Sequence, residues 1–270
     1  MRGTSRASLA AAEERFEPIL AAAGAQSSEL GQQLLAFVDA LDSSGSLRRT
    51  LADPSIEGDA KAGLVAHLLT NADPRVVEIA QSLVRARWSA DVDLADAAEQ
   101  LAFHAALARA EAEGNLAKVE EELFRFAKAL AGQREVRRAL FDTRVPAAAR
   151  IKLVDDLLAG RVTDVTAQIA RRAAAAPRGR RYVTTLGHIA DLIAERRERT
   201  VATVTTASSL SPTQQDRLAT ILREAYGREV QLNIVRDPQV LGGMRIQVGP
   251  QVVDATVLSR LADARRRLAG

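Results

Sequence analysis

An internal repeat constrains this chain more than any other feature of its sequence. Residues 33–56 align with residues 122–145 without a gap, so the two copies are 89 positions apart. The register holds beyond this stretch, and a one-residue slip then aligns Ile79-Ala80 with Ile169-Ala170. The matched positions include aromatic, acidic and paired basic residues as well as leucines: Phe37 with Phe126, Asp53 with Asp142, and Arg48-Arg49 with Arg137-Arg138. The repeat predicts two structural units of the same kind, produced by duplication.

The spacing of apolar residues predicts that each copy is a small helical bundle. In both copies four apolar residues recur at i, i+4, i+7 and i+11, which places them on one buried stripe of a helix. They are Leu30, Leu34, Phe37 and Leu41 in the first copy and Val119, Leu123, Phe126 and Leu130 in the second. Further helices are expected in matching pairs: 47–52 with 136–141, 59–69 with 147–158, and 74–87 with 164–176.

The two copies are not separated by a helix breaker. Gly24 and Gly114 close equivalent helical patterns, but neither Gly nor Pro occurs between Leu94 and Gly114. We therefore expect one long helix through Glu99 and His104, which ends the first copy and begins the second.

The sequence pattern changes near residue 200, where alternating β-branched residues predict a strand over 200–207. Ser211, Pro212 and Gln214 then fit the N-cap, first turn and third position of a helix with a capping box. Two further strands are expected over 230–235 and 244–248, and a closing helix over 256–268. The expected fold class is therefore mainly α, with two tandem helical bundles (1–102 and 103–198) and a small α/β domain (199–270).

The composition indicates a globular chain, with 47% hydrophobic and 26% charged residues. Cysteine is absent, which excludes disulfides and thiolate sites and fits a reducing compartment. No stretch approaches the roughly 18 consecutive apolar residues that a spanning helix needs. Glu13, Glu14 and Glu17 interrupt the start, where a signal peptide would have an apolar core. We expect a soluble chain with no membrane-inserted segment.

No combination of residues in the sequence predicts catalysis. His67, His104 and His188 each lack a second His or Cys at i+3 or i+4, so we expect no metal site from them. The aspartates within 91–96 lack the glycine and distal glutamate of a calcium loop, and Gly242-Gly243 belongs to no phosphate-binding motif. We expect no catalytic residue, metal or cofactor, and an enzyme has no positive sequence pattern in its favour.

Arginine accounts for most of the 37 basic residues, of which only four are lysines, and the formal net charge is +3. We interpret this balance as a compositional bias rather than as a polyanion-binding surface. One basic cluster, from Arg171 to Arg181, adjoins Tyr182 and could contact phosphates and a stacked base. We favour a solvated helix junction, and we keep a helical adaptor that binds RNA or DNA through this cluster as the alternative function.

The C-terminal run carries a family resemblance. In order, it has a strand over 201–207, Leu210-Ser211 before a polar helix, Asp237-Pro238, Leu241-Gly242-Gly243 before a strand, and Val253-Asp254-Ala255-Thr256. This order resembles the δ subunit family of F-type ATP synthase, which includes the oligomycin-sensitivity-conferring protein. Ala255 and Thr256 stand where the family usually has Gly and Ser. Residues from about 100 to 270 resemble a complete δ subunit, and the earlier residues resemble an added helical copy, as in longer bacterial members.

The resemblance implies a non-catalytic stator subunit of the peripheral stalk. The helical part of such a protein holds the N-terminal tails of α subunits on the catalytic α/β head. Its C-terminal domain binds the b-type stalk, and the two contacts resist rotor torque during proton-driven ATP synthesis. The implied location is peripheral, at the cytoplasmic face of the cell membrane, with no nucleic acid and no cofactor.

The resemblance also implies two sets of residues. Contact with the α tails is expected from the first and fifth helices of each copy, namely Phe16, Leu20, Ile79, Leu83 and Val84 in the first and Phe103, Leu107, Val165 and Ile169 in the second. The structural motif of the C-terminal domain comprises Leu210, Ser211, Asp237, Pro238, Gly242, Gly243, Asp254 and Thr256. For any single residue of the first set, core packing is the competing interpretation.

Overall fold

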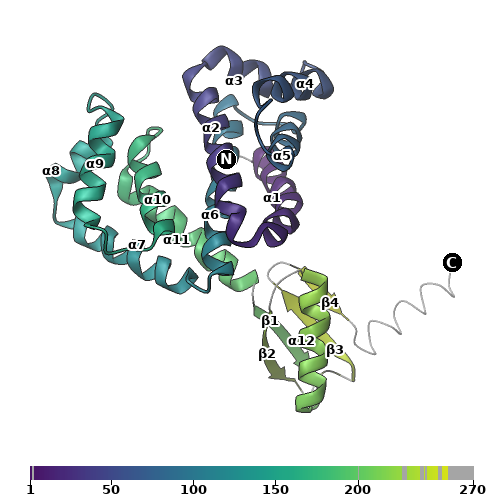
Figure 1. Ribbon diagram of the computed structural model, residues 1–270. Coiled ribbons are helices and arrows are strands. Elements are labelled where there is room, and N and C mark those ends of the chain that lie inside the picture. The colour runs from purple at the N-terminus through teal and green to yellow at the C-terminus, as the bar shows by residue number, and fades with distance from the viewer. Residues whose placement is uncertain are drawn as a thin grey trace. The chain divides into compact units, whose positions relative to one another are not determined.

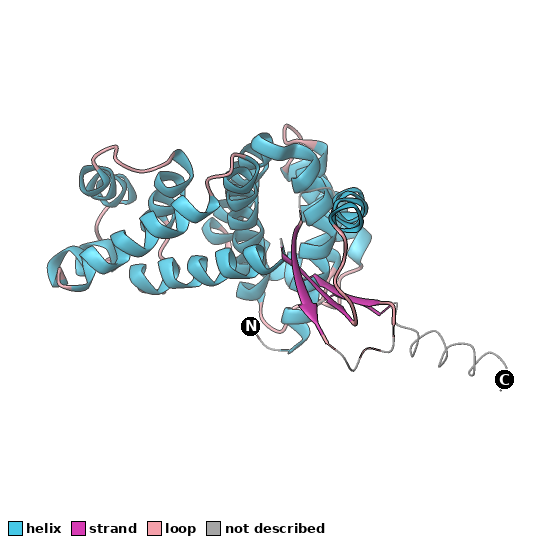
Figure 2. Ribbon diagram, turned by 90° about the horizontal axis from the view of Figure 1, so that it is seen from below, coloured by secondary structure: helices cyan, strands magenta, loops and turns pink. Residues whose placement is uncertain are grey.

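The computed structural model describes residues 1, 3–199, 201–226, 230–237, 240, 242–248 and 251–254. It divides into two compact units, Met1–Ala190 and Asp191–Gly270, and the boundary between them falls inside helix α11 (Tyr182–Arg199). The helices of both repeat copies lie in the first unit, apart from the end of α11, and the strands lie in the second (Figures 1 and 2). The expected mainly α fold with a C-terminal α/β region is confirmed, whereas the three expected domain ranges stay a prediction.

The helices of the first copy lie close to their predicted positions. They are α1 (Gly3–Ala23), the 3₁₀ turn η1 (Gly24–Gln26), α2 (Ser27–Ser43), α3 (Gly45–Ala52), α4 (Gly58–Leu68) and α5 (Pro74–Arg85). Two of them begin at side-chain caps. The Ser44 hydroxyl accepts from Leu47 N at 3.2 Å at the start of α3, and the Asp73 carboxylate accepts from Arg75 N at 2.9 Å at the start of α5.

The second copy repeats this order of helices. They are α7 (Leu116–Ala131), α8 (Arg134–Phe141), α9 (Ala147–Leu158) and α10 (Asp164–Ala175), followed by α11. Thr163 caps α10 by accepting from Thr166 N at 3.3 Å. The cap positions Asp73 and Thr163 are 90 residues apart, which agrees with the one-residue slip in the repeat.

The predicted long helix is confirmed as α6 (Asp91–Ala112), which is followed by Gly114 in the left-handed region at φ +68°. It contacts α1, α2, α3 and α5 of the first copy and also α7 and α10 of the second. Figure 1 shows α6 between these two groups of helices. Because most of its buried side chains are alanines, other helices approach its backbone closely. The two copies are therefore packed together along one shared helix.

The second unit is a four-stranded sheet in the order β2-β1-β3-β4. Its elements are β1 (Val201–Thr206), α12 (Pro212–Tyr226), β2 (Gln231–Arg236), β3 (Met244–Val248) and β4 (Gln251–Asp254). β1 pairs parallel with β2, whereas the β1–β3 and β3–β4 pairs are antiparallel. Leu218 and Leu222 of α12 pack with Ala202 and Val204 of β1 in its core.

Three of these strands were predicted, but β4 was not. Its four residues are too few to show the alternation that marks a strand, and Val252 and Val253 are both exposed. They are held in the sheet by pairing with β3, a long-range relationship that a local pattern does not contain. The predicted closing helix over 256–268 lies outside the described residues.

Candidate functional site

The residues expected to contact α tails lie in the core of the helical unit. None of the nine side chains is more than 3% exposed. Phe16 and Leu20 lie on α1, Ile79, Leu83 and Val84 on α5, Phe103 and Leu107 on α6, and Val165 and Ile169 on α10. The five residues of the first copy belong to one apolar cluster. Phe103 also lines a cavity of about 360 Å³ between α1 and α6, and its neighbours there include Leu9 and His188.

In the second copy, the helix pair expected to contact a partner is covered by α2 of the first copy. The Ser27 hydroxyl donates to the Ala105 carbonyl of α6 at 2.9 Å, and the Ser28 hydroxyl donates to Gln168 Oε1 of α10 at 2.8 Å. One turn along α2, a Cβ atom on Gly31 would lie 2.9 Å from the carbonyl oxygen of Ala102. Helix α2 therefore lies against both α6 and α10 at close range.

A buried acid–base network joins the two copies. Glu99 of α6 is 2% exposed and pairs with both Arg172 and Arg180. Arg172 Nη1 also donates to Asp39 Oδ1 of α2 at 2.6 Å. Because Arg172 belongs to the second copy and Asp39 to the first, the network connects the bundles, from the buried Arg172–Glu99 pair to the exposed carboxylate of Asp39.

Arg178 extends this network. Its guanidinium lies 3.2 Å from Asp42 Oδ2 and 3.0 Å from Asp96 Oδ1. The interpretation of the 171–181 cluster as solvated is therefore only partly correct. Arg172 and Arg178 are 8% and 10% exposed and pair with carboxylates of the first copy, whereas Arg180 is 30% exposed and Arg171 is 50% exposed. The same contacts occupy the guanidinium groups that binding of RNA or DNA would need, and Arg171 is paired with Asp155 at 2.6 Å.

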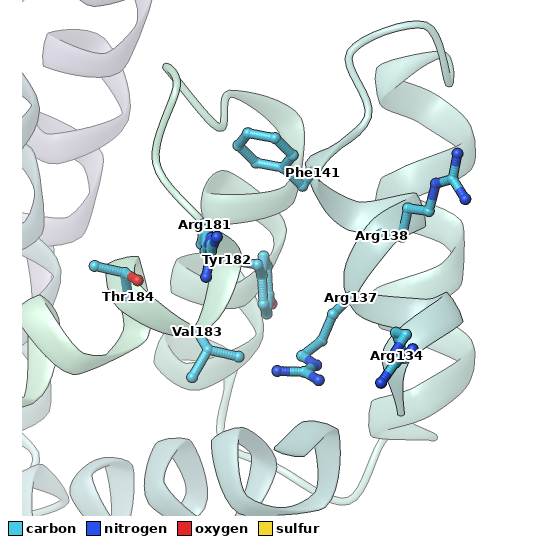
Figure 3. A pocket seen from close by; sticks show the side chains of 8 residues that line it. All are labelled: Arg134, Arg137, Arg138, Phe141, Arg181, Tyr182, Val183 and Thr184. Atoms are coloured by element: carbon cyan, nitrogen blue, oxygen red, sulfur yellow. The ribbon is translucent and has the colours of Figure 1, made fainter. Parts of the chain in front are cut away.

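A second basic cluster lies between α8 and α11, where it surrounds a cavity of about 510 Å³ (Figure 3). Its lining residues are Arg134, Arg137, Arg138 and Phe141 from α8, Arg181 directly before α11, and Tyr182, Val183 and Thr184 at the start of α11. Arg137-Arg138 align with Arg48-Arg49 of the first copy, but no local pattern around them predicts a site. The signal available was their combination with Arg181, more than forty residues later.

Tyr182 forms a fixed part of the floor of this cavity. Its ring packs edge-on against Phe126 with centroids 6.1 Å apart, and its hydroxyl donates to the Ala170 carbonyl at 3.0 Å. Burial raises the pKa of this hydroxyl far above its usual range, so Tyr182 stays neutral. Phe141, by contrast, is 44% exposed.

A cavity of about 420 Å³ lies between α7 and α11, and Val183 lines this one as well as the basic cavity. Its surface is mainly apolar and includes Phe124, which is 67% exposed, together with Leu186 and Gly187. Glu120 and Glu121 lie at its rim. The two cavities therefore form adjoining parts of one groove along α11.

The C-terminal motif forms turns and caps around the sheet. Ser211 N donates to Gln214 Oε1 at 2.9 Å and Gln214 N donates to Ser211 Oγ at 3.3 Å, which confirms the capping box. Asp237 N donates to the Thr206 carbonyl at 3.0 Å, joining β2 to β1. Gly242 and Gly243 have φ of +98° and +79°, a region that favours glycine.

The remaining motif residues are placed as follows. Leu210 packs against the core of the sheet, and Asp254 ends β4 opposite Arg245 of β3. Pro238 and Thr256 lie outside the described residues.

The described part of the chain contains no cluster of three or more His, Asp or Glu side chains with the spacing of a metal site. In that same part, no helix has the length and apolar character needed to cross a membrane. The three histidines remain apart from one another: His67 contacts a carbonyl of its own helix, His104 contacts Glu13, and His188 lines the cavity beside Phe103.

The chain is similar to known proteins over its whole length. Residues 103–268 match the family described as ATP synthase delta (OSCP) subunit. The ATP synthase subunit delta of Beutenbergia cavernae is 50% identical, with all of both chains covered. That of Kineococcus radiotolerans is 44% identical, covering 99% of this chain and 98% of its own, and that of Streptomyces coelicolor is 42% identical, covering 100% and 98%. The part of the chain before residue 103 is thus also shared by these relatives.

Proposed function

This chain belongs to the ATP synthase delta (OSCP) subunit family, and from that premise we propose how its two units join the parts of an F-type ATP synthase. It is a non-catalytic subunit of the peripheral stalk. The observation that carries this conclusion is the match to curated delta subunits along the entire chain, including the added helical copy.

The helical unit is proposed to bind the catalytic head through the N-terminal tails of α subunits. A tail that forms an amphipathic helix fits a helical bundle with partly exposed apolar side chains. Since α2 covers α6 and α10, we assign this contact to α1 and α5 of the first copy, where Ile19 stays partly buried at the edge of the apolar cluster. The five core residues of the first copy, Phe16, Leu20, Ile79, Leu83 and Val84, would then support the contact from below.

The C-terminal unit is proposed to bind the b-type stalk. Two separate units suit a linker between head and stalk, because each can bind its own partner. In the assembled enzyme the chain would lie at the cytoplasmic face of the cell membrane and would be held there by its partners.

The absence of cysteine provides a direct test, because any single cysteine introduced is unique. Ile19→Cys in α1, Lys128→Cys in α7 and Arg223→Cys in α12 would each carry a photo-crosslinker in the full chain within reconstituted ATP synthase. We expect crosslinks from position 19 to an α subunit and from position 223 to a b-type subunit. Crosslinks to α from position 128 and none from position 19 would overturn the assignment of the first copy.

The alternative function, a helical adaptor that binds RNA or DNA through the 171–181 cluster, has its own test. Binding of RNA by the purified chain, falling steeply with salt and needing no ATP synthase subunit, would support an adaptor role. The ion pairs of Arg172, Arg178 and Arg180 argue against it.

A further inference from the structure

Three of the four arginines around the α8–α11 cavity are not neutralised within the described part of the chain. The guanidinium groups of Arg134, Arg137 and Arg181 form no ion pair with a described residue, whereas the charge of Arg138 acts on the Asp142 carboxylate and the arginines of the neighbouring 171–180 segment form ion pairs. Cations gathered around one space repel one another, so the arrangement of Arg134, Arg137 and Arg181 costs free energy in the unbound chain. An anionic partner would remove that cost.

In the first copy, the positions equivalent to Arg137 and Arg181 are held together by an attractive ion pair. There Arg48 of α3 donates from Nε to Asp91 Oδ2 at the start of α6 at 2.9 Å. The repeat places Arg137 at the position of Arg48, 89 residues later, and, after the one-residue slip, Arg181 at the position of Asp91. The attractive pair of the first copy is thus replaced by two like charges in the second.

Exposed apolar side chains lie beside the arginines of the α8–α11 cavity. Phe141 is exposed at one end of the basic cavity, and Val183 joins that cavity to the apolar one between α7 and α11. Phe124 is more exposed than any other large hydrophobic side chain in the described residues. A Cβ atom on Gly187 would meet nothing within 4 Å, so the floor of this groove is open. The groove therefore offers an apolar strip that ends in a basic patch.

We propose that this groove, formed by α7, α8 and α11, is a docking site for an amphipathic helix of another protein, with acidic residues at the end that lies over α8. The apolar face of such a helix covers Phe124 and Val183, and its carboxylates pair with the unneutralised arginines. Nucleic acid fits less well, because Glu120 and Glu121 at the rim would repel phosphates and the apolar strip would stay uncovered. The proposal goes beyond the stator role and does not depend on which subunit supplies the helix.

The test uses the full chain and three labelled 20-residue peptides in fluorescence anisotropy. The first has leucines at i, i+3, i+4 and i+7 in successive turns and four glutamates at one end. The second replaces the glutamates with lysines, and the third replaces the leucines with serines. We expect the first peptide to bind at least about tenfold more tightly than either of the others, and to weaken with salt. Equal binding of the acidic and basic peptides would overturn the proposal.

Two variants assign the binding to the groove, each with a matched control. Arg181→Asp restores the charge that the first copy has at this position, so it should pair with Arg137 and lower the affinity for the acidic peptide about tenfold or more without unfolding the chain. Its control is Arg49→Asp, at the first-copy counterpart of Arg138. Gly187→Leu fills the apolar part, and Gly63→Leu, on an equally open helical position in α4, is its control.

Each outcome has a definite meaning. Loss of binding in both groove variants and retention in both controls supports the proposal. If Arg181→Asp and Gly187→Leu bind the acidic peptide as the unchanged chain does, the groove is not the site and the proposal fails. If a 20-nucleotide RNA displaces the peptide while the serine-substituted peptide binds equally well, the cluster is a polyanion site and the apolar strip has no part in it.

Discussion

Arg172 of α10 and Asp39 of α2 lie 2.6 Å apart and form an ion pair between the two repeat copies. Behind them, Arg172 Nε lies 3.6 Å from Glu99 Oε1, which places the carboxylate of α6 between two arginines of the second copy. The first 110 residues have fifteen acidic and ten basic side chains, and the remainder has the opposite excess. Part of this charge asymmetry is neutralised within the protein, where carboxylates of the first copy pair with arginines of the second.

Removing Glu99 should destabilise the helical unit strongly. Glu99→Ala would leave Arg172 and Arg180 without their shared buried carboxylate, and breaking a buried pair in this way costs about 3–5 kcal/mol. Urea unfolding monitored by circular dichroism measures the change. As a control, Asp59→Ala removes an exposed partner of Arg85 and should cost less than about 1 kcal/mol. Similar costs for the two variants would show that the Glu99 network is not a stabilising junction.

The close approach of α2 and α6 depends on Gly31. Gly31→Ala would place a Cβ atom 2.9 Å from the Ala102 carbonyl oxygen and 3.0 Å from the Ala105 side chain, and neither backbone nor Cβ can rotate away. The helices must separate, at a cost of about 1–3 kcal/mol in the free energy of unfolding. Gly63→Ala meets nothing within 4 Å and should instead stabilise the chain by up to about 1 kcal/mol. A stabilising effect at Gly31 would contradict this packing.

Much of the fold follows from local sequence patterns. The capping box at Ser211 and the long helix α6 are predicted because caps, breakers and apolar spacing act within a few residues of one another. The repeat adds a further constraint, because equivalent positions such as Lys61 and Arg150 are both buried and both bond to carbonyl groups.

The features that were missed depend on contacts between distant residues. The pairing of Arg178 with Asp42 and Asp96 brings together positions 136 and 82 residues apart, and no local pattern shows which arginines will be buried. For the same reason, the groove between α8 and α11 could not be predicted from Arg137 or Arg181 alone. The nine residues expected to contact α tails lie in the core instead. An apolar helix position can fill a core as readily as line a surface, and the local pattern does not distinguish the two.

Arg150 anchors the end of α10 in the second copy. Its guanidinium donates to the carbonyls of Ala174 at 2.8 Å, Ala175 at 2.8 Å, Val145 at 2.9 Å and Asp142 at 3.1 Å. Arg150→Ala would leave one buried and three partly buried acceptors without this donor and should cost about 3–5 kcal/mol.

Arg150→Lys should cost clearly less, about 1–2 kcal/mol. The equivalent Lys61 of the first copy shows that a lysine reaches the matching carbonyl, of Asp53, at 3.0 Å. Urea unfolding of both variants gives the comparison. An equal cost for alanine and lysine would mean that the shape of the side chain, rather than its hydrogen bonds, matters at this position.

Glu122 makes stability depend on pH at the start of α10. Burial would raise the pKa of its carboxyl, but hydrogen bonds donated by Thr166 Oγ1 at 2.6 Å, Thr163 N at 2.9 Å and Thr163 Oγ1 at 2.9 Å outweigh burial and hold the pKa below its usual value of 4.5. Because the pKa is lower in the folded state, the ionised carboxylate stabilises the fold above about pH 4.5, and this contribution is lost as pH falls through the folded-state pKa.

Glu122→Gln tests this dependence. The equivalent Gln33 of the first copy accepts from Asp73 N at 2.7 Å, so a glutamine at position 122 should keep the bond from Thr163 N and the fold. It should unfold about 1 kcal/mol more easily than the unchanged chain at pH 6, because an amide accepts hydrogen bonds less strongly than a carboxylate. Urea unfolding between pH 6 and pH 3 should show this difference shrinking as Glu122 becomes protonated. A difference that stays constant over that range would show that the ionised carboxylate at position 122 does not stabilise the fold.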